Sequence, residues 1–309
     1  MEKRNIVIGL PRALLYYRYG DLWRTFFKEL NIKTIVSSPT SRETMKIGET
    51  LITDEACLSL KIYFGHVKEL IGKCDYILVP HIDNYGRDKS TCIRFHALYD
   101  MTTNVFRETD QKFITYTVDA LHGKSEKDAF IKMGESLGFT AKQAKKAYKS
   151  AIKLSEDHFK EKVKKQNKLL KQDQMKVLIV GHSYMENDAY IGHVITDFLK
   201  RNGVIPIFAD IVDQDDALKK SRKLSPTNKW EMSRELIGSI VMNKDKVDGI
   251  ILMTAFPCNI DSIADDLIIR RVKDKPILQL MLDGQSGVAG VETRLESFID
   301  IIRFKEGTL

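Results

Sequence analysis

The stretch NIVIGLPRALLYYRYGDLWRTFFKEL, residues 5–30, decides the fold. Its first six residues form a short, β-branched apolar run followed by Pro11, which predicts a buried strand. Residues 11–30 then predict a helix, because proline suits a first helical turn, with a break or kink at Gly20. A buried strand that passes directly into a helix is typical of α/β proteins with a parallel sheet.

The same alternation runs through most of the chain. Residues 32–38 and 75–80 predict two more strands, and a polar loop leads from the second of them to Cys92. Residues 125–172 have no strand pattern, and Thr140 followed by Gln143 predicts a capping box for a long helix. After this segment the alternation resumes, with expected strands at 176–181, 204–210, 247–256 and 276–283 and expected helices at 189–203, 230–243, 262–272 and 291–304.

We therefore expect the α/β class, with two similar parallel-sheet units and a helical insert between them. The expected boundaries are an N-terminal α/β domain at 1–120, a Lys-rich helical linker at 121–173 and a C-terminal α/β domain at 174–309. The length of 309 residues also favours more than one domain.

The formal net charge of +7 comes from one segment. Residues 141–172 hold 11 lysines and only three acids, and the remainder of the chain is nearly balanced. The charge therefore does not indicate a nucleic-acid partner. The segment is either a solvated helix that joins two domains or a surface for an acidic or phosphate-bearing partner.

The chain contains no apolar run long enough for a membrane span and no pattern of a signal peptide at its first residues. We expect a cytoplasmic protein without membrane association.

Three of the four cysteines are expected where active-site loops lie, and two of them, Cys92 and Cys258, follow predicted strands. Cys57, Cys92 and Cys258 lie in loops or first helical turns, where ligands of α/β sheets bind, whereas Cys74 precedes a strand. No C-x-x-C pair is present, which disfavours a zinc ribbon. The three isolated thiols are either small buried fillers or one site, and three thiolates at one point need a cation such as zinc or an iron–sulfur cluster.

Six stretches of the chain, from near its first residue to near its last, together resemble one family. The resemblance is to the 2-hydroxyacyl-CoA dehydratase and double-cubane-cluster group, in its acyl-CoA dehydratase activase-related (DUF2229-like) branch. The stretches are GLPRALLYYRYGDLWRTFF (9–27), DEACLSLKIYFGHV (54–67), CIRF (92–95), GHSYMENDAYI (181–191), FPCNIDSIADDLIIRRVKDKPILQLMLD (256–283) and GVETRLESFID (290–300).

The resemblance implies two Rossmann-like α/β domains and an oxygen-sensitive [4Fe–4S] cluster, with Cys57, Cys92 and Cys258 as its ligands. It implies an ATP-hydrolysing activase as a partner that delivers single electrons at low potential. Dehydratases of the group use the electron to make a ketyl radical on a 2-hydroxyacyl-CoA and eliminate water, and double-cubane relatives use a similar supply to reduce small molecules. The chain itself has no phosphate loop with a G-K-[ST] anchor, so we expect ATP to bind the partner.

Further candidate site residues lie near these cysteines. His182 and Tyr184 follow a strand and are candidates for catalytic proton donation or substrate anchoring, although His182 could equally cap its loop. Lys61 could complement a ligand phosphate or the cluster charge, or could be a solvated lysine. Asp261 and Ser262 match the family pattern after the last cysteine, where Asn259-Ile260 replaces the Gly-Pro usual in relatives.

Two functions remain open on the sequence. The first is a component of an iron–sulfur lyase or of an ATP-dependent reductase, acting on an acyl-CoA or another small molecule. The second is a non-catalytic, cluster-carrying electron-transfer or assembly partner of a larger reductase. In either case a related subunit, as a homo- or heterodimer, is a possible partner.

Overall fold

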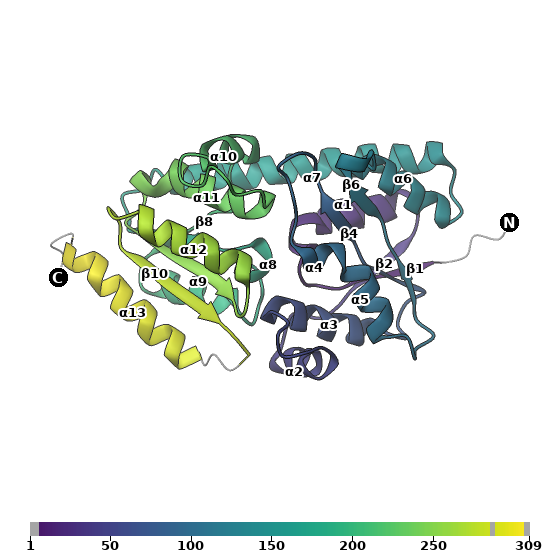
Figure 1. Cartoon of the computed structure of the whole chain (residues 1–309), viewed down its shortest axis with the longest axis horizontal. Coiled ribbons are helices and arrows are strands. Elements are labelled where there is room, and N and C mark those ends of the chain that lie inside the picture. Colours follow the sequence, from purple (N-terminus) through teal and green to yellow (C-terminus); the bar gives the residue numbers. More distant parts are fainter. Residues whose placement is uncertain (1–5, 285–287, 306–309) are drawn as a thin grey trace. The chain divides into compact units, whose positions relative to one another are not determined.

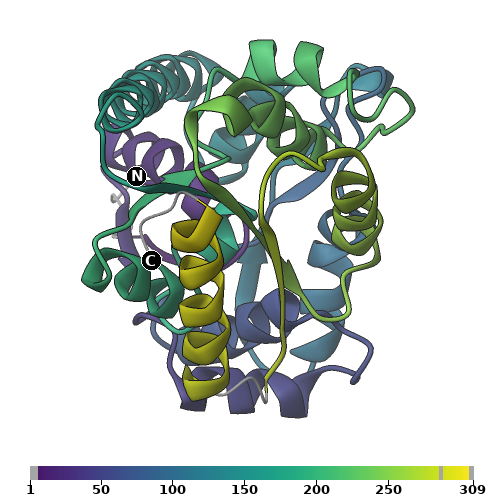
Figure 2. The ribbon, with the colours of Figure 1, turned by 90° about the vertical axis from the view of Figure 1, so that its left-hand side faces the viewer.

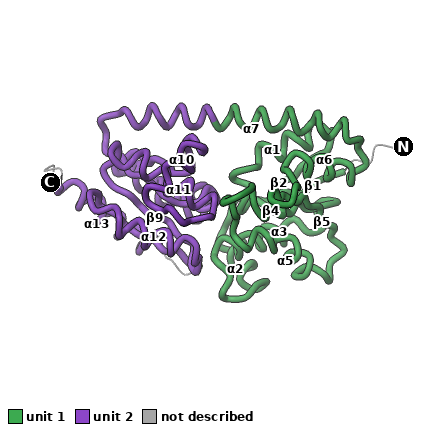
Figure 3. The backbone as a smooth tube through the Cα atoms, turned by 45° about the horizontal axis from the view of Figure 1, so that its top comes forward, with its two compact units in different colours: residues 1–159 green, residues 160–309 purple. Residues whose placement is uncertain are grey.

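The computed structural model describes residues 6–284 and 288–305. The chain forms two compact units, Met1–Phe159 and Lys160–Leu309 (Figure 3). Each unit contains its own parallel four-stranded sheet. The predicted class, α/β with two Rossmann-like parallel-sheet domains, is therefore confirmed. The unit boundary falls within one long helix, α7 (Ala141–Leu169), and the three-part division with a linker at 121–173 stays a prediction.

The sheet of the first unit has the strand order β2-β1-β3-β5, and every pair in it is parallel. Figure 1 labels β1 and β2 of this sheet. Strands β4 and β6 follow β3 and β5 directly and form a second parallel pair. The strands are β1 (Val7–Leu10), β2 (Lys33–Val36), β3 (Tyr76–Leu78), β4 (His81–Asn84), β5 (Lys112–Ile114) and β6 (Thr117–Asp119). The helices that belong wholly to this unit are α1 (Tyr16–Glu29), α2 (Arg42–Leu51), α3 (Leu58–Leu70), α4 (Ile93–His96), α5 (Leu98–Val105), η1 (Ala120–His122) and α6 (Glu126–Ser136).

Aromatic side chains form much of the core of the first unit. Phe26 of α1 packs edge-on against Phe130 of α6, and Phe130 in turn contacts Tyr148 of α7. Trp23 is buried and donates a hydrogen bond from Nε1 to the hydroxyl of Tyr116, 3.0 Å away. Burial of such large rings supplies a major part of the hydrophobic stabilisation of a unit of this size.

Helices α2 and α3 pack unusually closely through two glycines. A Cβ atom on Gly48 would lie 1.8 Å from the carbonyl oxygen of Lys61, and one on Gly65 would lie 2.0 Å from that of Thr44. Only glycine allows the two backbones to approach so far. This contact fixes the position of α3, whose first turn begins at Cys57.

The sheet of the second unit has the order β10-β9-β7-β8 and is also entirely parallel. Helices α9 and α13 cover one of its faces, and α11 and α12 cover the other (Figure 2). The strands are β7 (Lys176–Val180), β8 (Ile205–Phe208), β9 (Gly249–Ala255) and β10 (Ile277–Leu282). The helices are α8 (Ser183–Glu186), α9 (Gly192–Arg201), α10 (Gln214–Ser221), α11 (Glu231–Asn243), η2 (Lys244–Lys246), α12 (Asn259–Arg271) and α13 (Val288–Lys305).

Several local predictions need correction. The helix expected over 11–30 begins only at Tyr16, because residues 11–15 form turns in which Leu14 takes a positive φ of 47°. Gly20 does not break α1, since it is buried within the helix beneath the ring of Tyr16. The loop expected before Cys92 contains β4, a short polar strand whose only buried apolar side chain is Ile82.

The predicted start of the long helix is confirmed. The backbone N–H of Thr140 donates to Gln143 Oε1 at 2.9 Å, and the N–H of Gln143 donates to Thr140 Oγ1 at 3.3 Å. Among the described residues, none of the helices is long and apolar enough to cross a membrane.

Candidate functional site

The site in the second unit lies where the strand order of its sheet reverses. The chain passes from β7 to β8 on one side and later enters β9 on the other side of β7. The loops after β7 and β9 therefore diverge and leave a crevice at the carboxyl ends of these strands. His182 follows β7, and Cys258 follows β9.

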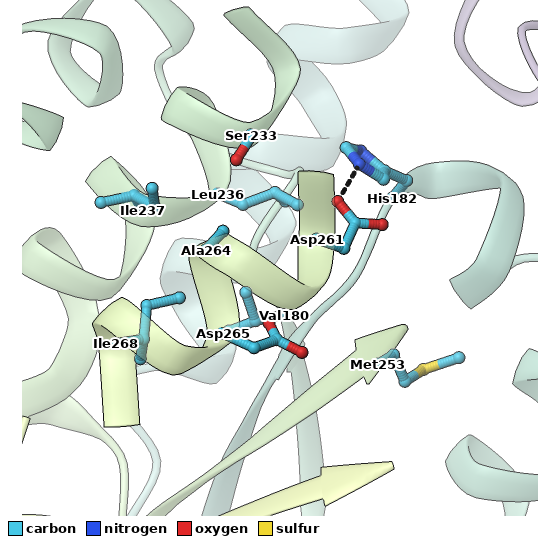
Figure 4. Close-up of a pocket in the computed structure, with 10 residues that line it drawn as sticks. All are labelled: Val180, His182, Ser233, Leu236, Ile237, Met253, Asp261, Ala264, Asp265 and Ile268. Atoms are coloured by element: carbon cyan, nitrogen blue, oxygen red, sulfur yellow. Dashed lines mark hydrogen bonds and ion pairs between the residues drawn. The ribbon is translucent and has the colours of Figure 1, made fainter. Parts of the chain in front are cut away.

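Four of the predicted residues meet in this crevice. Cys258 is the N-cap residue of α12, and its thiol hydrogen-bonds to the carboxylate of Asp261 one turn later. His182, the N-cap residue of α8, donates from Nε2 to Asp261 Oδ1 at 2.9 Å (Figure 4). Tyr184 stacks on the imidazole with ring centroids 5.0 Å apart. Asp261 therefore links the cysteine loop to the histidine loop.

The pKa values of two carboxyl groups on successive turns of α12 are shifted in opposite directions. Burial disfavours the charge of Asp261, but the imidazole of His182 and the hydrogen bonds from His182 and Cys258 outweigh it and lower its pKa. Burial and the neighbouring charge of Asp261 raise the pKa of Asp265 to about 6, against hydrogen bonds from Thr254 and Gln279. Asp261 is thus an anionic anchor, and Asp265 can exchange a proton near neutral pH.

A pocket opens beside these groups (Figure 4). Four polar side chains, of His182, Ser233, Asp261 and Asp265, line it together with apolar ones. Such a lining suits a small group that needs both an apolar wall and a proton donor or acceptor. The apolar part consists of Val180, Leu236, Ile237, Met253, Ala264 and Ile268.

The remaining predicted cysteine ligands belong to the first unit. Cys57 is the N-cap residue of α3 and Cys92 that of α4, both with extended backbone conformations. Neither side chain, nor that of Cys258, accepts a capping hydrogen bond from its own helix. At α3 and α12 the positive end of the helix dipole favours a thiolate at the N-cap.

Cys74 differs from the other three cysteines. It lies between α3 and β3, at the amino end of the sheet, where its thiol packs against Gly9 and donates to the carbonyl of Leu70 at 3.6 Å. Burial raises the pKa of this thiol to about 11. These contacts favour a structural thiol over a fourth ligand.

Lys61 and Ser262 have local partners. The charge of Lys61 acts on Glu55, whose pKa is lowered first by a backbone hydrogen bond, then by one from Thr53, and last by this lysine. The hydroxyl of Ser262 donates to the carbonyl oxygen of Cys258 at 2.7 Å, so it supports the first turn of α12 instead of lining the pocket. Their roles as cofactor-binding residues stay predictions.

Within residues 6–284 and 288–305, no group of three or more His, Cys, Asp or Glu side chains is arranged to hold a metal ion. Cys57 and Cys92 belong to the first unit and Cys258 to the second. The three-cysteine ligand set stays a prediction.

The sequence analysis missed several residues of the second unit. Asp265 could have been predicted from the sequence, because it lies four residues after Asp261 and therefore on the same face of a helix. Glu186 and Asp210 carry no such signal. They follow neighbouring strands, hydrogen-bond to each other, and Glu186 is buried, with Oε1 accepting from the N–H of Gly181 at 3.1 Å.

Comparison with solved structures gives only weak similarity. The SBP FpvC from Pseudomonas aeruginosa in complex with Mn²⁺ is 12% identical, with a TM-score of 0.29 over 97% of this chain and 98% of that chain. Nitrogenase Cp1 is 14% identical, with a TM-score of 0.25 over 98% of this chain and 57% of that one. The C-terminal domain of glucosamine-fructose-6-phosphate aminotransferase from Francisella tularensis is 11% identical, with a TM-score of 0.24 over 98% and 86% of the two chains. These TM-scores are too low to support an argument about function.

No curated protein matches the chain. A family model does match it, over residues 7–212, which include β1 through β8, two of the three candidate cysteine ligands and His182. The match agrees with the activase-related branch to which the sequence motifs point. The chain belongs to the family described as CoA enzyme activase uncharacterised domain (DUF2229).

Proposed function

We propose that the chain is an iron–sulfur protein of the 2-hydroxyacyl-CoA dehydratase type, in which Cys57, Cys92 and Cys258 hold a [4Fe–4S] cluster. The observation that carries the proposal is the shared local geometry of these three cysteines. Each is the N-cap residue of an α-helix and has an extended backbone conformation, and Cys74 is not an N-cap residue. Three similarly presented thiols suit a common cation better than unrelated core positions do.

Apolar side chains beside the cysteines support this proposal. Ile93 follows Cys92 directly and is 67% exposed, and Phe256 lies two residues before Cys258 and is 50% exposed. Large exposed apolar side chains next to thiols would exclude water from a bound cluster, which tunes its potential and protects it.

When bound, such a cluster supplies a low-potential electron and an iron position open to a substrate oxygen. The residues of the second unit would serve the proton chemistry. His182 is oriented by Asp261 and stacked on Tyr184, so its ring is held in one position. Asp265, with a pKa of about 6, would exchange protons with a substrate group in the pocket.

The family supports a role in a CoA enzyme activation system. We infer that an ATP-hydrolysing activase delivers the electron and that an acyl-CoA dehydratase or a related subunit is a further partner. The description of the family as an activase domain favours a second candidate function, a cluster-carrying component that passes electrons on without its own turnover.

The first test measures iron and acid-labile sulfide in protein purified without oxygen, together with visible absorption and EPR. Wild type should contain about four irons and four sulfides per chain, the content of a [4Fe–4S] cluster. Cys57→Ala, Cys92→Ala and Cys258→Ala should each lose the cluster, because each removes one of its ligands. Cys74→Ala is the matched control and should keep it. Wild-type protein that stays free of iron after anaerobic reconstitution would refute the proposal.

Two further measurements separate the candidate functions. Consumption of a 2-hydroxyacyl-CoA in the presence of an activase and ATP would identify an enzyme, and cluster oxidation by a partner without turnover would identify a carrier. Tight ATP binding by the isolated chain would contradict our expectation that ATP binds the partner.

A further inference from the structure

The first unit contains an arginine whose charge has no partner within the described part of the chain. Arg12 lies in the turns directly after β1, and its backbone N–H donates to Ser37 Oγ, 2.8 Å away, in the loop after β2. The side chain is half-buried, and its Nε is fully enclosed without an acceptor. Within residues 6–284 and 288–305, its guanidinium group makes neither a hydrogen bond nor an ion pair.

A second enclosed nitrogen lies near this arginine. His66 of α3 is completely buried, and its Nε2 lies 2.9 Å from Thr40 Oγ1. Its Nδ1 is enclosed without a partner in the described residues. Burial lowers the pKa of His66 to about 4, with Glu69 opposing and the positive charge of Arg12 adding to the effect, so the ring is neutral at neutral pH.

Glu69, the acid that acts on His66, already has hydrogen-bond and charge partners. Glu69 accepts hydrogen bonds from the N–H and the hydroxyl of Ser38, at 3.0 and 2.8 Å, and lies 4.0 Å from the ammonium of Lys73. It makes no ion pair with Arg12. In the loop after β2, the buried hydroxyl groups of Ser37 and Thr40 contact the backbone N–H of Arg12 and Nε2 of His66.

A half-buried guanidinium whose Nε is enclosed without a partner needs an explanation. Removing a guanidinium from water costs several kcal/mol unless an anion or hydrogen-bond acceptors replace the water. Folded proteins rarely leave such groups unsatisfied. Arg12 also lies at the carboxyl end of β1, the strand at which the order β2-β1-β3-β5 reverses, and ligands of open α/β sheets bind at this position.

We propose that Arg12, Ser37, Thr40 and His66 form a binding site for a small-molecule oxyanion, the carboxylate or phosphate group of a ligand. The planar guanidinium suits two oxygens of one anion. If Thr40 donates to Nε2, the neutral His66 ring carries its proton on Nδ1 and becomes a second donor. The exposed side of Arg12 gives the anion access from solvent. This proposal is independent of the cluster.

The test compares inorganic phosphate and acetate with chloride at equal ionic strength, using thermal unfolding and calorimetric titration of the full chain. At least one of the two oxyanions should raise the melting temperature of wild type more than chloride does. A larger effect of phosphate would assign the site to phosphate esters, and a larger effect of acetate would assign it to carboxylates.

Arg12→Met should weaken oxyanion binding at least about tenfold, because charge-assisted hydrogen bonds are lost. In oxyanion-free buffer it should be at least as stable as wild type, since an unpaired charge is removed. Arg12→Lys keeps the positive charge but lacks the planar guanidinium that can donate to two oxygens of one anion. It should therefore bind the oxyanion with intermediate affinity. Arg107→Met, at a side chain that is 65% exposed, is the matched control and should bind as wild type does.

Either of two results would overturn the proposal. One is a wild-type protein that responds to both oxyanions no more than to chloride, a result that does not depend on the folding of any variant. The other is an Arg12→Met variant that folds but is much less stable in oxyanion-free buffer, which would show that Arg12 is paired within the fold.

Discussion

Replacing Gly65 with alanine should lower the free energy of unfolding by about 3 kcal/mol or more, the upper range for forcing extra atoms into a packed interior. The added Cβ would lie 2.0 Å from the carbonyl oxygen of Thr44, so the backbones of α2 and α3 must separate. Alanine would gain about 1 kcal/mol of helix propensity over glycine, which is too little to compensate. Urea denaturation of wild type and variant measures the difference.

Gly290→Ala is the matched control for this substitution. Gly290 lies in α13, and a Cβ atom added there would have no neighbouring atom within 4 Å, so the same chemical change should stabilise the protein by up to about 1 kcal/mol. Equal stability of Gly65→Ala and wild type would mean that α2 and α3 are not in backbone contact. Gly48→Ala, with a Cβ 1.8 Å from the carbonyl oxygen of Lys61, should repeat the loss.

Glu186→Gln should stabilise the protein at pH 8 and should lose most of this advantage at pH 5. Burial, the charge of Asp210 and the hydrogen bond between the two carboxyl groups raise the pKa of Glu186 well above its ordinary value of 4.5. Above pH 4.5 the unfolded chain releases this proton while the folded chain retains it. The free energy of unfolding of wild type therefore falls with rising pH, by up to about 1.4 kcal/mol per unit, until the folded pKa is reached.

The amide removes this dependence because it cannot ionise, and it can still accept from the N–H of Gly181 and donate to Asp210. Asp265, whose raised pKa gives a trend of the same sign, is present in both proteins and cancels in the difference. Asp210→Asn should reduce this pH dependence only in part, because burial of Glu186 remains. Glu296→Gln, at an exposed position of α13, should change little at any pH. A gain in stability that is the same at pH 5 and pH 8 would contradict a shared proton in this pair.

The predicted elements are right where a local pattern is strong. The buried runs at β7 and β9, and the capping box at Thr140 and Gln143, are determined by residues only a few positions apart. The errors fall where tertiary contacts override that pattern. The start of α1 moves to Tyr16, and β4 forms from a polar stretch because β6 lies beside it and completes its hydrogen bonds.

In the candidate site, too, some features follow from local sequence patterns and others only from tertiary contacts. The sequence places His182 and Cys258 after strands, which suffices to predict that they lie at a ligand-binding edge. It does not predict that Asp261 holds His182, 79 positions away, at 2.9 Å. That contact requires β7 and β9 to be neighbours in the sheet.

The sequence alone therefore determined the α/β class, most of the alternating strands and helices, and the position of Cys258 directly after a strand. Tertiary structure alone decided the contact of His182 with Asp261, the contact of Glu186 with Asp210, and the enclosure of Arg12 Nε and His66 Nδ1. The reason is physical. Hydrophobic periodicity, caps and turns act over a few residues, whereas burial, pairing and pKa shifts depend on strand order and packing between residues far apart in the chain.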